Sequence, residues 1–198
     1  VVAALLVGAP LVVHRGWPVV LIVASSIVAA WAYMGGPKPI AYTPFGDVTV
    51  FLFFGLMAVC GTVYVQAGTI GTAGWLAGVA IGLLAASVLT VNNHRDIAHD
   101  ATTGRRTLSV VLGAAGSRAV YRTSVLGAFA LLPPIAWAAG SAWYLLPLAL
   151  LRRALALLAA FDAAPGGHAY TPLLFRTVIL EAGFGMLLAA GALLSLVP

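Results

Sequence analysis

The sequence has little charge. Five acidic and ten basic side chains make up 8% of its 198 residues, whereas about a quarter of the residues in a typical soluble domain are charged. The mean hydropathy is +1.06, and long apolar runs alternate with short polar breaks. This pattern predicts an all-α fold, a polytopic bundle of transmembrane helices. The period-two alternation of a membrane β-barrel is not found in the apolar runs.

The sequence also has a single cysteine, Cys60, inside an apolar run. One thiol provides neither a disulfide framework nor a metal cluster, so we expect Cys60 to be a small buried side chain. The chain begins in the middle of an apolar run, without Met or a basic stretch before it, and so does not resemble a secretory signal peptide. We expect further residues upstream of Val1.

Seven apolar segments are candidate spans, since a spanning helix needs about 20 residues. Arg152 and Arg153 interrupt the sixth segment. It is either a short tilted span that leaves the membrane near Arg152 and continues as a surface helix, or a full span with snorkelling arginines. The segments are 1–13 (short, as if truncated), 17–34, 45–66, 68–91, 119–139, 141–160 and 174–197.

The net charge of +5 would suggest nucleic-acid binding in a soluble protein, but here the bases lie between apolar runs. Alternating the loops across the membrane puts Arg15 alone on one side. By the positive-inside rule the other side is cytoplasmic, which puts the start of the chain in the cytoplasm and its C-terminus outside. Because membrane topology explains the bases, we expect no nucleic-acid partner. The bases on that side are Lys38, Arg95, Arg105, Arg106, Arg118, Arg122, Arg152, Arg153 and Arg176.

One short stretch, VNNHRDIAHDATTGRRTL at 91–108, holds two of the five acidic residues and three of the ten bases. Asn92, Asp96 and Asp100 are four residues apart, so a helix would present them as a ladder on one face. Two carboxylates one turn apart repel each other, and a divalent cation relieves that repulsion. Mg²⁺ binds carboxylate, water and phosphate oxygens, so the ladder predicts a site for a Mg²⁺–diphosphate complex.

The residues beside this ladder suit the same ligand. Arg95, Arg105 and Arg106 could bind the phosphate oxygens that the metal leaves free. The alternative is a solvated loop in which acids and bases pair weakly. The adjacent Asn92 and Asn93 disfavour that alternative, because Asn adds little to a helix and needs hydrogen-bond partners.

A second polar stretch, YMGGPKPIAYTPFGD at 33–47, lies on the same predicted side. Lys38 stands between two prolines, whose stiff backbone would hold its ammonium where a leaving diphosphate needs a cation. The alternative is an ordinary loop lysine. Tyr42 is a candidate aromatic or hydrogen-bonding wall, and Asp47 suits the start of the 45–66 helix, where acids are favoured.

Glu181 lies inside the last apolar segment, where a carboxylate is costly and is therefore a candidate functional group. Arg176 precedes it by about one turn, so a structural ion pair is the alternative. A transporter or channel with a cytoplasmic acidic cation site is a second class of function. That class needs polar residues along the spans, and Glu181 is the main one here.

Two stretches resemble a known family. NNHRDIAHDATTGRRTLSVVLG resembles the second Asp-rich motif of the UbiA-type intramembrane prenyltransferases, in the form NNxRDxxxDxxxGxRTLxVxLG of the 1,4-dihydroxy-2-naphthoate polyprenyltransferase branch. GGPKPIAYTPFGDVTVFLFFGLMAVCGTVYVQ is similar to the same branch. The similarity covers nearly the whole chain.

This resemblance implies a nine-helix bundle with a central cavity open to the cytoplasm and to lipid, flanked by two Asp-rich motifs that bind Mg²⁺ and prenyl diphosphate. Asp96 and Asp100 would be the metal-binding pair of the second motif, supported by Asn92, Asn93 and Arg95. The first motif, which the family has between helices two and three, is not in this sequence. We therefore expect a single prenyltransferase domain that lacks its first two helices.

The resemblance further implies an activity. A polyprenyl chain would pass from polyprenyl diphosphate to 1,4-dihydroxy-2-naphthoate in the cell membrane, with loss of diphosphate and CO₂, giving demethylmenaquinone. Lys38 would contact the diphosphate. The alternative within the superfamily is another aromatic acceptor such as 4-hydroxybenzoate, and the GGPKPIAYTPFG loop favours naphthoate. The resemblance specifies no oligomeric state.

Overall fold

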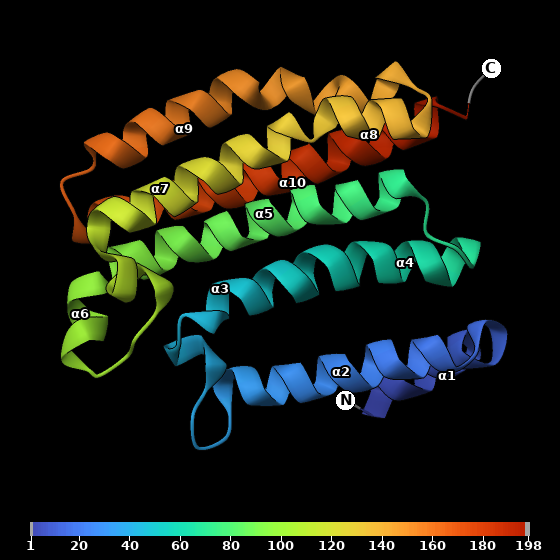
Figure 1. Cartoon of the computed structure of the whole chain (residues 1–198), viewed down its shortest axis with the longest axis horizontal. Helices are drawn as coiled ribbons and strands as arrows, with labels where there is room; N and C mark the ends of the chain where they lie inside the picture. Colours follow the sequence, from blue (N-terminus) through green and yellow to red (C-terminus); the bar gives the residue numbers. More distant parts are fainter. Residues whose placement is uncertain (1, 197–198) are drawn as a thin grey trace.

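The computed structural model describes residues 2–196, with side chains from residue 8 onward. Seven helical rods run side by side along the long axis of the molecule and are joined by turns at their ends (Figure 1). All regular secondary structure in residues 2–196 is helical, which confirms the predicted helical bundle. Residues 1, 197 and 198, at the ends of the first and last predicted segments, lie outside the described residues.

The rods alternate in direction, and several consist of more than one helical element. Two short elements, η1 (Ile40–Tyr42) and α6 (Ile97–Thr102), lie in the connections. The rods are α1 (Val2–Arg15); α2 (Trp17–Met34); α3, η2 and α4 (Phe45–Val50, Phe51–Met57 and Ala58–Ala67); α5 (Thr72–Arg95); α7 and α8 (Leu108–Ala130 and Leu132–Ala139); η3 and α9 (Ala142–Leu150 and Leu151–Ala163); and η4 and α10 (Gly167–Tyr170 and Thr171–Leu194).

Six rods among the described residues are long and apolar enough to cross a membrane. They correspond to six of the seven predicted segments, and α1, with 14 residues, is shorter than a span. The fifth rod begins at Leu108, earlier than predicted, and α10 begins at Thr171. Arg118, which the predicted segments leave in a loop, therefore lies within α7. Arg122 and Arg176 lie within helices, as their predicted segments imply, and a long arginine side chain can extend from a helix toward polar surroundings.

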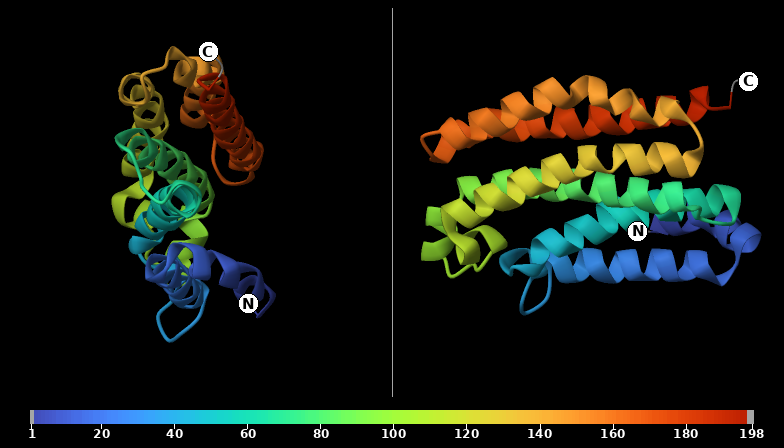
Figure 2. Two further views of the ribbon diagram at one scale, coloured as in Figure 1. Left: turned by 90° about the vertical axis from the view of Figure 1, so that its right-hand side faces the viewer. Right: turned by 45° about the horizontal axis from the view of Figure 1, so that its top comes forward.

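The sixth predicted segment is one continuous rod. η3 passes into α9 without a break, and α9 runs to Ala163 beside α7 and α10 (Figure 2). This favours the full span over the alternative in which the chain leaves the bundle near Arg152. Arg152 and Arg153 lie on the exposed side of α9. The buried residues of α9 join the main core: Ala154, Leu157, Leu158 and Phe161.

Glycines bring α5 unusually close to the rod formed by α3, η2 and α4. A Cβ atom on Gly55 would overlap Gly82 and would lie 2.6 Å from the carbonyl oxygen of Gly78. Small residues allow helix backbones to approach closely in membranes. Cys60 is buried at the same interface, as the sequence predicts. This close approach places the start of α3 beside the end of α5.

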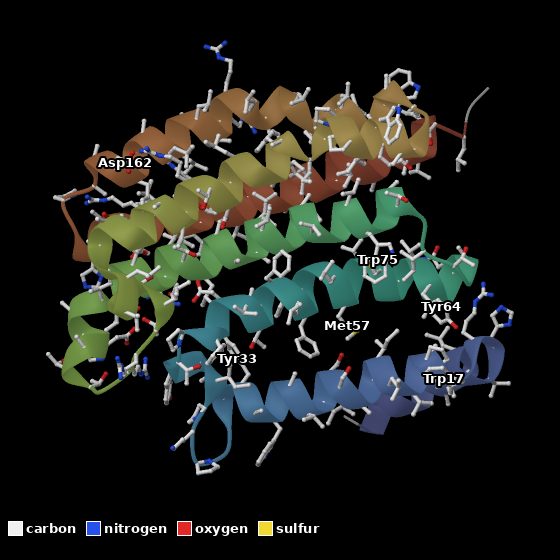
Figure 3. All side chains as sticks on the ribbon, in the orientation of Figure 1. Trp17, Tyr33, Met57, Tyr64, Trp75 and Asp162 are labelled. Carbon is white, nitrogen blue, oxygen red and sulfur yellow. The ribbon has the colours of Figure 1, made fainter. Side chains whose placement is uncertain are left out.

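Polar connections gather at one end of the bundle. The turn after α2, helix α6 and the turn before α10 share the left end in Figure 1, and the α1–α2 and α4–α5 turns lie at the right. Figure 3 shows Asp162 at the first end and Trp17, Tyr64 and Trp75 at the other. The two polar stretches singled out in the sequence therefore lie at the same end, as the alternation of loops predicts.

Candidate functional site

The predicted carboxylate ladder is interrupted at Asp96. Helix α5 ends at Arg95, and Asp96 has φ −101° and ψ 8°, outside the α-helical range, before α6 begins. The expectation of one continuous helix from Asn92 to Asp100 is therefore wrong. The Asp100 N–H still donates to the Asp96 carbonyl oxygen at 2.8 Å, so the two aspartates remain about one helical turn apart.

Asp96 is held by the arginine that precedes it. Arg95 donates from Nε to Asp96 Oδ1 at 2.8 Å and from Nη2 to Oδ2 at 2.7 Å, and Nη2 also donates to Asn92 Oδ1 at 3.0 Å. The hydrogen bonds from Arg95 hold the pKa of Asp96 below its usual value, and the charges of His99 and His168 act in the same direction. The Asp96 side chain is 34% exposed, so it remains accessible to a ligand.

Asp100 is buried and pairs with the loop that follows it. Its side chain is 4% exposed, and Arg105 Nη1 lies 3.3 Å from its Oδ1. Gly104, with φ 76°, turns the chain back so that the Arg105 N–H reaches the Asp100 carbonyl oxygen at 3.0 Å. The Arg105 guanidinium lies 4.3 Å from the Tyr42 ring centre, and the Arg106 N–H donates to the Tyr42 carbonyl oxygen at 2.9 Å. The two polar stretches are thus in direct contact.

Asp47 belongs to this site, although the sequence predicted for it only a position at the start of a helix. It lies in the first turn of α3, and no side-chain cap bond is made there. Its buried carboxylate instead accepts hydrogen bonds from α5: Thr90 Oγ1 lies 3.2 Å from Oδ1, and Asn93 Nδ2 lies 3.4 Å from Oδ2. A carboxylate at the start of an apolar run was the only signal in the sequence, and it did not reveal these partners.

Lys38 and Arg106 are placed at this end without a side-chain partner. Both side chains are exposed, and neither makes a side-chain hydrogen bond or ion pair within residues 8–196. The structure therefore brings the backbone of the Lys38 loop to the aspartates and does not bring the ammonium into contact with them. A role in binding diphosphate remains a prediction for both residues.

His94 packs beneath the site, against Tyr170 and Phe161. Its Nε2 lies 3.1 Å from the Tyr170 hydroxyl, and its ring packs 4.8 Å from the centre of the Phe161 ring. The Tyr170 hydroxyl is also 3.4 Å from the carbonyl oxygens of Phe161 and Ala164. These contacts tie the last turn of α5 to α9 and η4, so they fix the position from which Asp96 projects.

The donors at this end suit a hard divalent cation. Asp96, Asp100 and Asn92 offer oxygen atoms, and a carboxylate has lone pairs beyond those that one arginine uses. No group of three or more His, Cys, Asp or Glu side chains converges in the described part of the chain. Mg²⁺ in proteins is often held by one or two carboxylates together with water and substrate phosphates. The donor set therefore fits Mg²⁺ bound jointly with a phosphate ligand.

An apolar groove of about 410 Å³ leads from Asn92 along the bundle between η2, α5 and α10. A second groove, of about 500 Å³, lies between α2 and the rod of α3 and η2, where Tyr33 lines it (Figure 3). The first groove is lined by Asn92, a candidate metal residue. It therefore provides an apolar space next to the polar end.

Comparison with known proteins connects this arrangement to one family. The sequence profile of the UbiA prenyltransferase family matches residues 1–164. The 1,4-dihydroxy-2-naphthoate octaprenyltransferase of Mycobacterium tuberculosis is 48% identical over 99 residues, which are 50% of this chain and 34% of that protein. The enzyme of the same name in Escherichia coli is 42% identical over 102 residues, 52% of this chain and 33% of that protein. The matched segments thus span about a third of these relatives. No solved structure gives a significant match.

Proposed function

This chain belongs to the UbiA prenyltransferase family, and on that premise we propose that the protein carrying it transfers a polyprenyl chain to 1,4-dihydroxy-2-naphthoate. The donor is polyprenyl diphosphate, and diphosphate and CO₂ leave, so that the hydroquinone form of demethylmenaquinone is produced. Relatives at 42–48% identity bear this acceptor in their names. The protein is a multi-pass membrane protein, with six helices long and apolar enough to span a bilayer.

The contact of the two polar stretches is the observation that carries this proposal. Arg105 pairs with Asp100 and also stacks on Tyr42. The stretch 91–108, which carries both aspartates, and the stretch 33–47, which carries Lys38, therefore form one polar surface. A diphosphate bears several negative charges, and this surface offers carboxylates for a cation together with guanidinium groups. Two apolar grooves beside this surface, one lined by Asn92 and one by Tyr33, suit the hydrocarbon part of the same substrate and the aromatic acceptor.

Asp96 and Asp100 would hold Mg²⁺, which supplies positive charge that neutralises the diphosphate as the allylic C–O bond breaks. Arg95 and Arg105 now bond these carboxylates. When a cation occupies the carboxylates, the two guanidinium groups are free to bond phosphate oxygens, for which their planar fork is well suited. Arg95, which lowers the pKa of Asp96, would thus keep that carboxylate ionised before binding, and both arginines would stabilise the leaving group afterwards.

Lys38 and the groove have complementary roles in this proposal. The exposed Lys38 ammonium adds a mobile positive charge for the departing diphosphate. The apolar walls of the groove exclude water from the allylic carbon, which would otherwise react with water. The end of the bundle that carries Lys38 and Asp96 is proposed to face the cytoplasm, because it gathers most of the bases.

The test is an acceptor competition with the protein that carries this chain, reconstituted in liposomes. Polyprenyl diphosphate and Mg²⁺ are supplied with 1,4-dihydroxy-2-naphthoate, with 4-hydroxybenzoate, or with both. We expect Mg²⁺-dependent transfer to the naphthoate with release of CO₂. Transfer to 4-hydroxybenzoate alone would overturn the proposed acceptor. Divalent-cation flux without any transfer would overturn the enzymatic function in favour of the transporter alternative.

A further inference from the structure

Glu181 is a half-buried carboxylate in the middle of the last span. It lies ten residues after the start of α10, inside the apolar stretch Gly167–Leu194. Charged groups at such a depth are costly and usually functional. Its side chain makes no ion pair and no hydrogen bond within the part of the chain whose side chains are described. The structural ion pair with Arg176, which was the alternative prediction from the sequence, is therefore not formed.

Helix geometry explains why Glu181 and Arg176 do not meet. Five residues on an α-helix correspond to about 500° of rotation, so the two side chains project about 140° apart. Arg176 lines a groove between α9 and α10 together with Arg153. Glu181 lines the other groove, between η2, α5 and α10. The carboxylate therefore faces the side of α10 that the candidate active site occupies.

The groove that Glu181 lines is otherwise almost entirely apolar. Its volume is about 410 Å³, and its only hydrogen-bonding side chains are those of Asn92 and Glu181. Phe54 and Phe175 contribute aromatic rings to its walls. The remaining lining residues are aliphatic: Val50, Ala85, Val88, Leu89, Leu174 and Val178. A ligand in this groove can thus form side-chain hydrogen bonds at two places only.

These two places are at different depths. Helices α5 and α10 pack side by side and run in opposite directions (Figure 1), so Asn92 lies near the level of Leu174 and Ala85 near the level of Glu181. Asn92 and Ala85 are seven residues apart on α5, and Leu174 and Glu181 are seven residues apart on α10. Seven residues of an α-helix correspond to about 10 Å. Asn92 therefore lies at the metal–diphosphate end and Glu181 about 10 Å deeper along the groove.

We propose that Glu181 accepts a hydrogen bond from a ring hydroxyl of the aromatic acceptor and thereby positions the ring in this groove. This inference rests on the proposed function. The reacting allylic carbon must lie next to the diphosphate, and the acceptor ring must lie next to that carbon. The hydroxyl on the ring carbon next to the reacting carbon can then point along the groove toward Glu181. The aromatic rings of Phe54 and Phe175 provide surfaces for a flat ligand.

The same hydrogen bond supports the chemistry. A carboxylate that accepts a hydrogen bond from a phenolic hydroxyl in an apolar site increases electron density on the ring, because the low dielectric strengthens the interaction. The ring carbon forms its bond to the allylic carbon, and the allylic C–O bond breaks with its electron pair on the diphosphate. The proton of the hydroxyl next to the reacting carbon passes to the Glu181 carboxylate, and that ring oxygen becomes a ketone. The ring carboxylate, on the reacting carbon, then leaves as CO₂ with its bonding electrons returned to the ring, and the proton passes back from Glu181 to the ring oxygen, which restores the hydroquinone.

The test compares Glu181→Leu and Glu181→Gln with the control Arg176→Gln, which changes the opposite side of the same helix. We expect Glu181→Leu to lower kcat/KM for 1,4-dihydroxy-2-naphthoate about 10- to 100-fold, the range for losing a hydrogen bond to a charged group. The KM for polyprenyl diphosphate and the melting temperature should stay near those of the wild type. Glu181→Gln keeps an acceptor oxygen and should retain much of the binding but lose turnover. The control should leave all these values unchanged.

A ligand analogue separates this role from a general effect on packing. The wild-type protein should bind the naphthoate more tightly than the O-methyl ether of its ring hydroxyls, whereas Glu181→Leu should bind both equally. If Glu181→Leu retains both the wild-type kcat/KM and the preference for the hydroxyl, the inference is overturned and the proposed function stands. If the wild-type protein transfers nothing to the naphthoate, the proposed function fails and the inference fails with it.

Discussion

Arg105 stacks on Tyr42, with the guanidinium carbon 4.3 Å from the ring centre, although the two residues belong to different loops. The same guanidinium pairs with the buried Asp100. One side chain therefore joins the turn after α2 to the hairpin that carries both aspartates. This explains how two stretches that are separate in the sequence form one site.

Removing the Tyr42 ring should loosen this connection. We expect Tyr42→Ala to weaken Mg²⁺-dependent binding of polyprenyl diphosphate about 2- to 30-fold, since a cation–π contact contributes about 0.5–2 kcal/mol. Tyr42→Phe keeps both the ring and the backbone carbonyl that Arg106 contacts, so it should bind as the wild type does. Titration calorimetry on the detergent-solubilised protein measures both variants. Equal affinities for Tyr42→Ala and Tyr42→Phe would show that the stacking has no part in the site.

Asp47 should be important for stability as well as for the site. Asp47→Ala leaves the Asn93 amide without its acceptor, whereas the Thr90 hydroxyl still donates to the Ala86 carbonyl oxygen at 2.9 Å. A buried unsatisfied group costs about 1–3 kcal/mol. We therefore expect a clear fall in the melting temperature. Asp162→Ala is the control, because its ion pair with Arg122 is partly exposed and such pairs contribute about 0–1 kcal/mol. An equal fall for both variants would contradict the role assigned to Asp47.

The close approach of α5 to the α3–η2–α4 rod makes a further prediction. Gly55→Ala puts a Cβ against Gly82 and the Gly78 carbonyl, and overpacking of this kind costs about 1–3 kcal/mol. Gly61→Ala is the matched control, because Gly61 lies in α4 of the same rod and a Cβ there would meet only the Ile22 side chain, at ordinary distances of 3.6 and 3.8 Å. Thermal unfolding followed by circular dichroism should show a lower melting temperature for Gly55→Ala only. Two unchanged melting temperatures would mean that the helices separate without cost.

Much of the fold follows from hydropathy, because a run of about 20 apolar residues can satisfy its backbone in lipid only as a helix. The start of the fifth rod does not follow in the same way. Gly113, with φ 67°, breaks the helical backbone between Leu108 and Arg118. The fifth segment predicted from hydropathy begins only after this break. Hydropathy averages over a window, whereas a kink depends on the conformation of one residue.

The site shows the same limit more clearly. The spacing of Asn92, Asp96 and Asp100 correctly identified the polar residues at one end of the bundle. It could not predict that Asp96 would leave the helix, because the spacing of side chains says nothing about the backbone conformation of one residue. It also gave no sign of the bonds that Asp47 makes, because these depend on how closely two distant rods pack. Spacing reports neighbours within one helix and not contacts between helices.

The assignment of Asp96 and Asp100 to the metal is tested most directly by mutation. The measurement is Mg²⁺-dependent prenyl transfer by Asp96→Asn and Asp100→Asn in the protein that carries this chain. Asp162→Asn is the matched control, since Asp162 lies at the same end of the bundle and pairs with Arg122 outside the site (Figure 3). We predict that each site variant loses activity about 100-fold or more, the scale of removing a group that stabilises developing charge, while Asp162→Asn keeps its activity. Wild-type turnover in both Asp96→Asn and Asp100→Asn would contradict the assignment of these carboxylates to the metal.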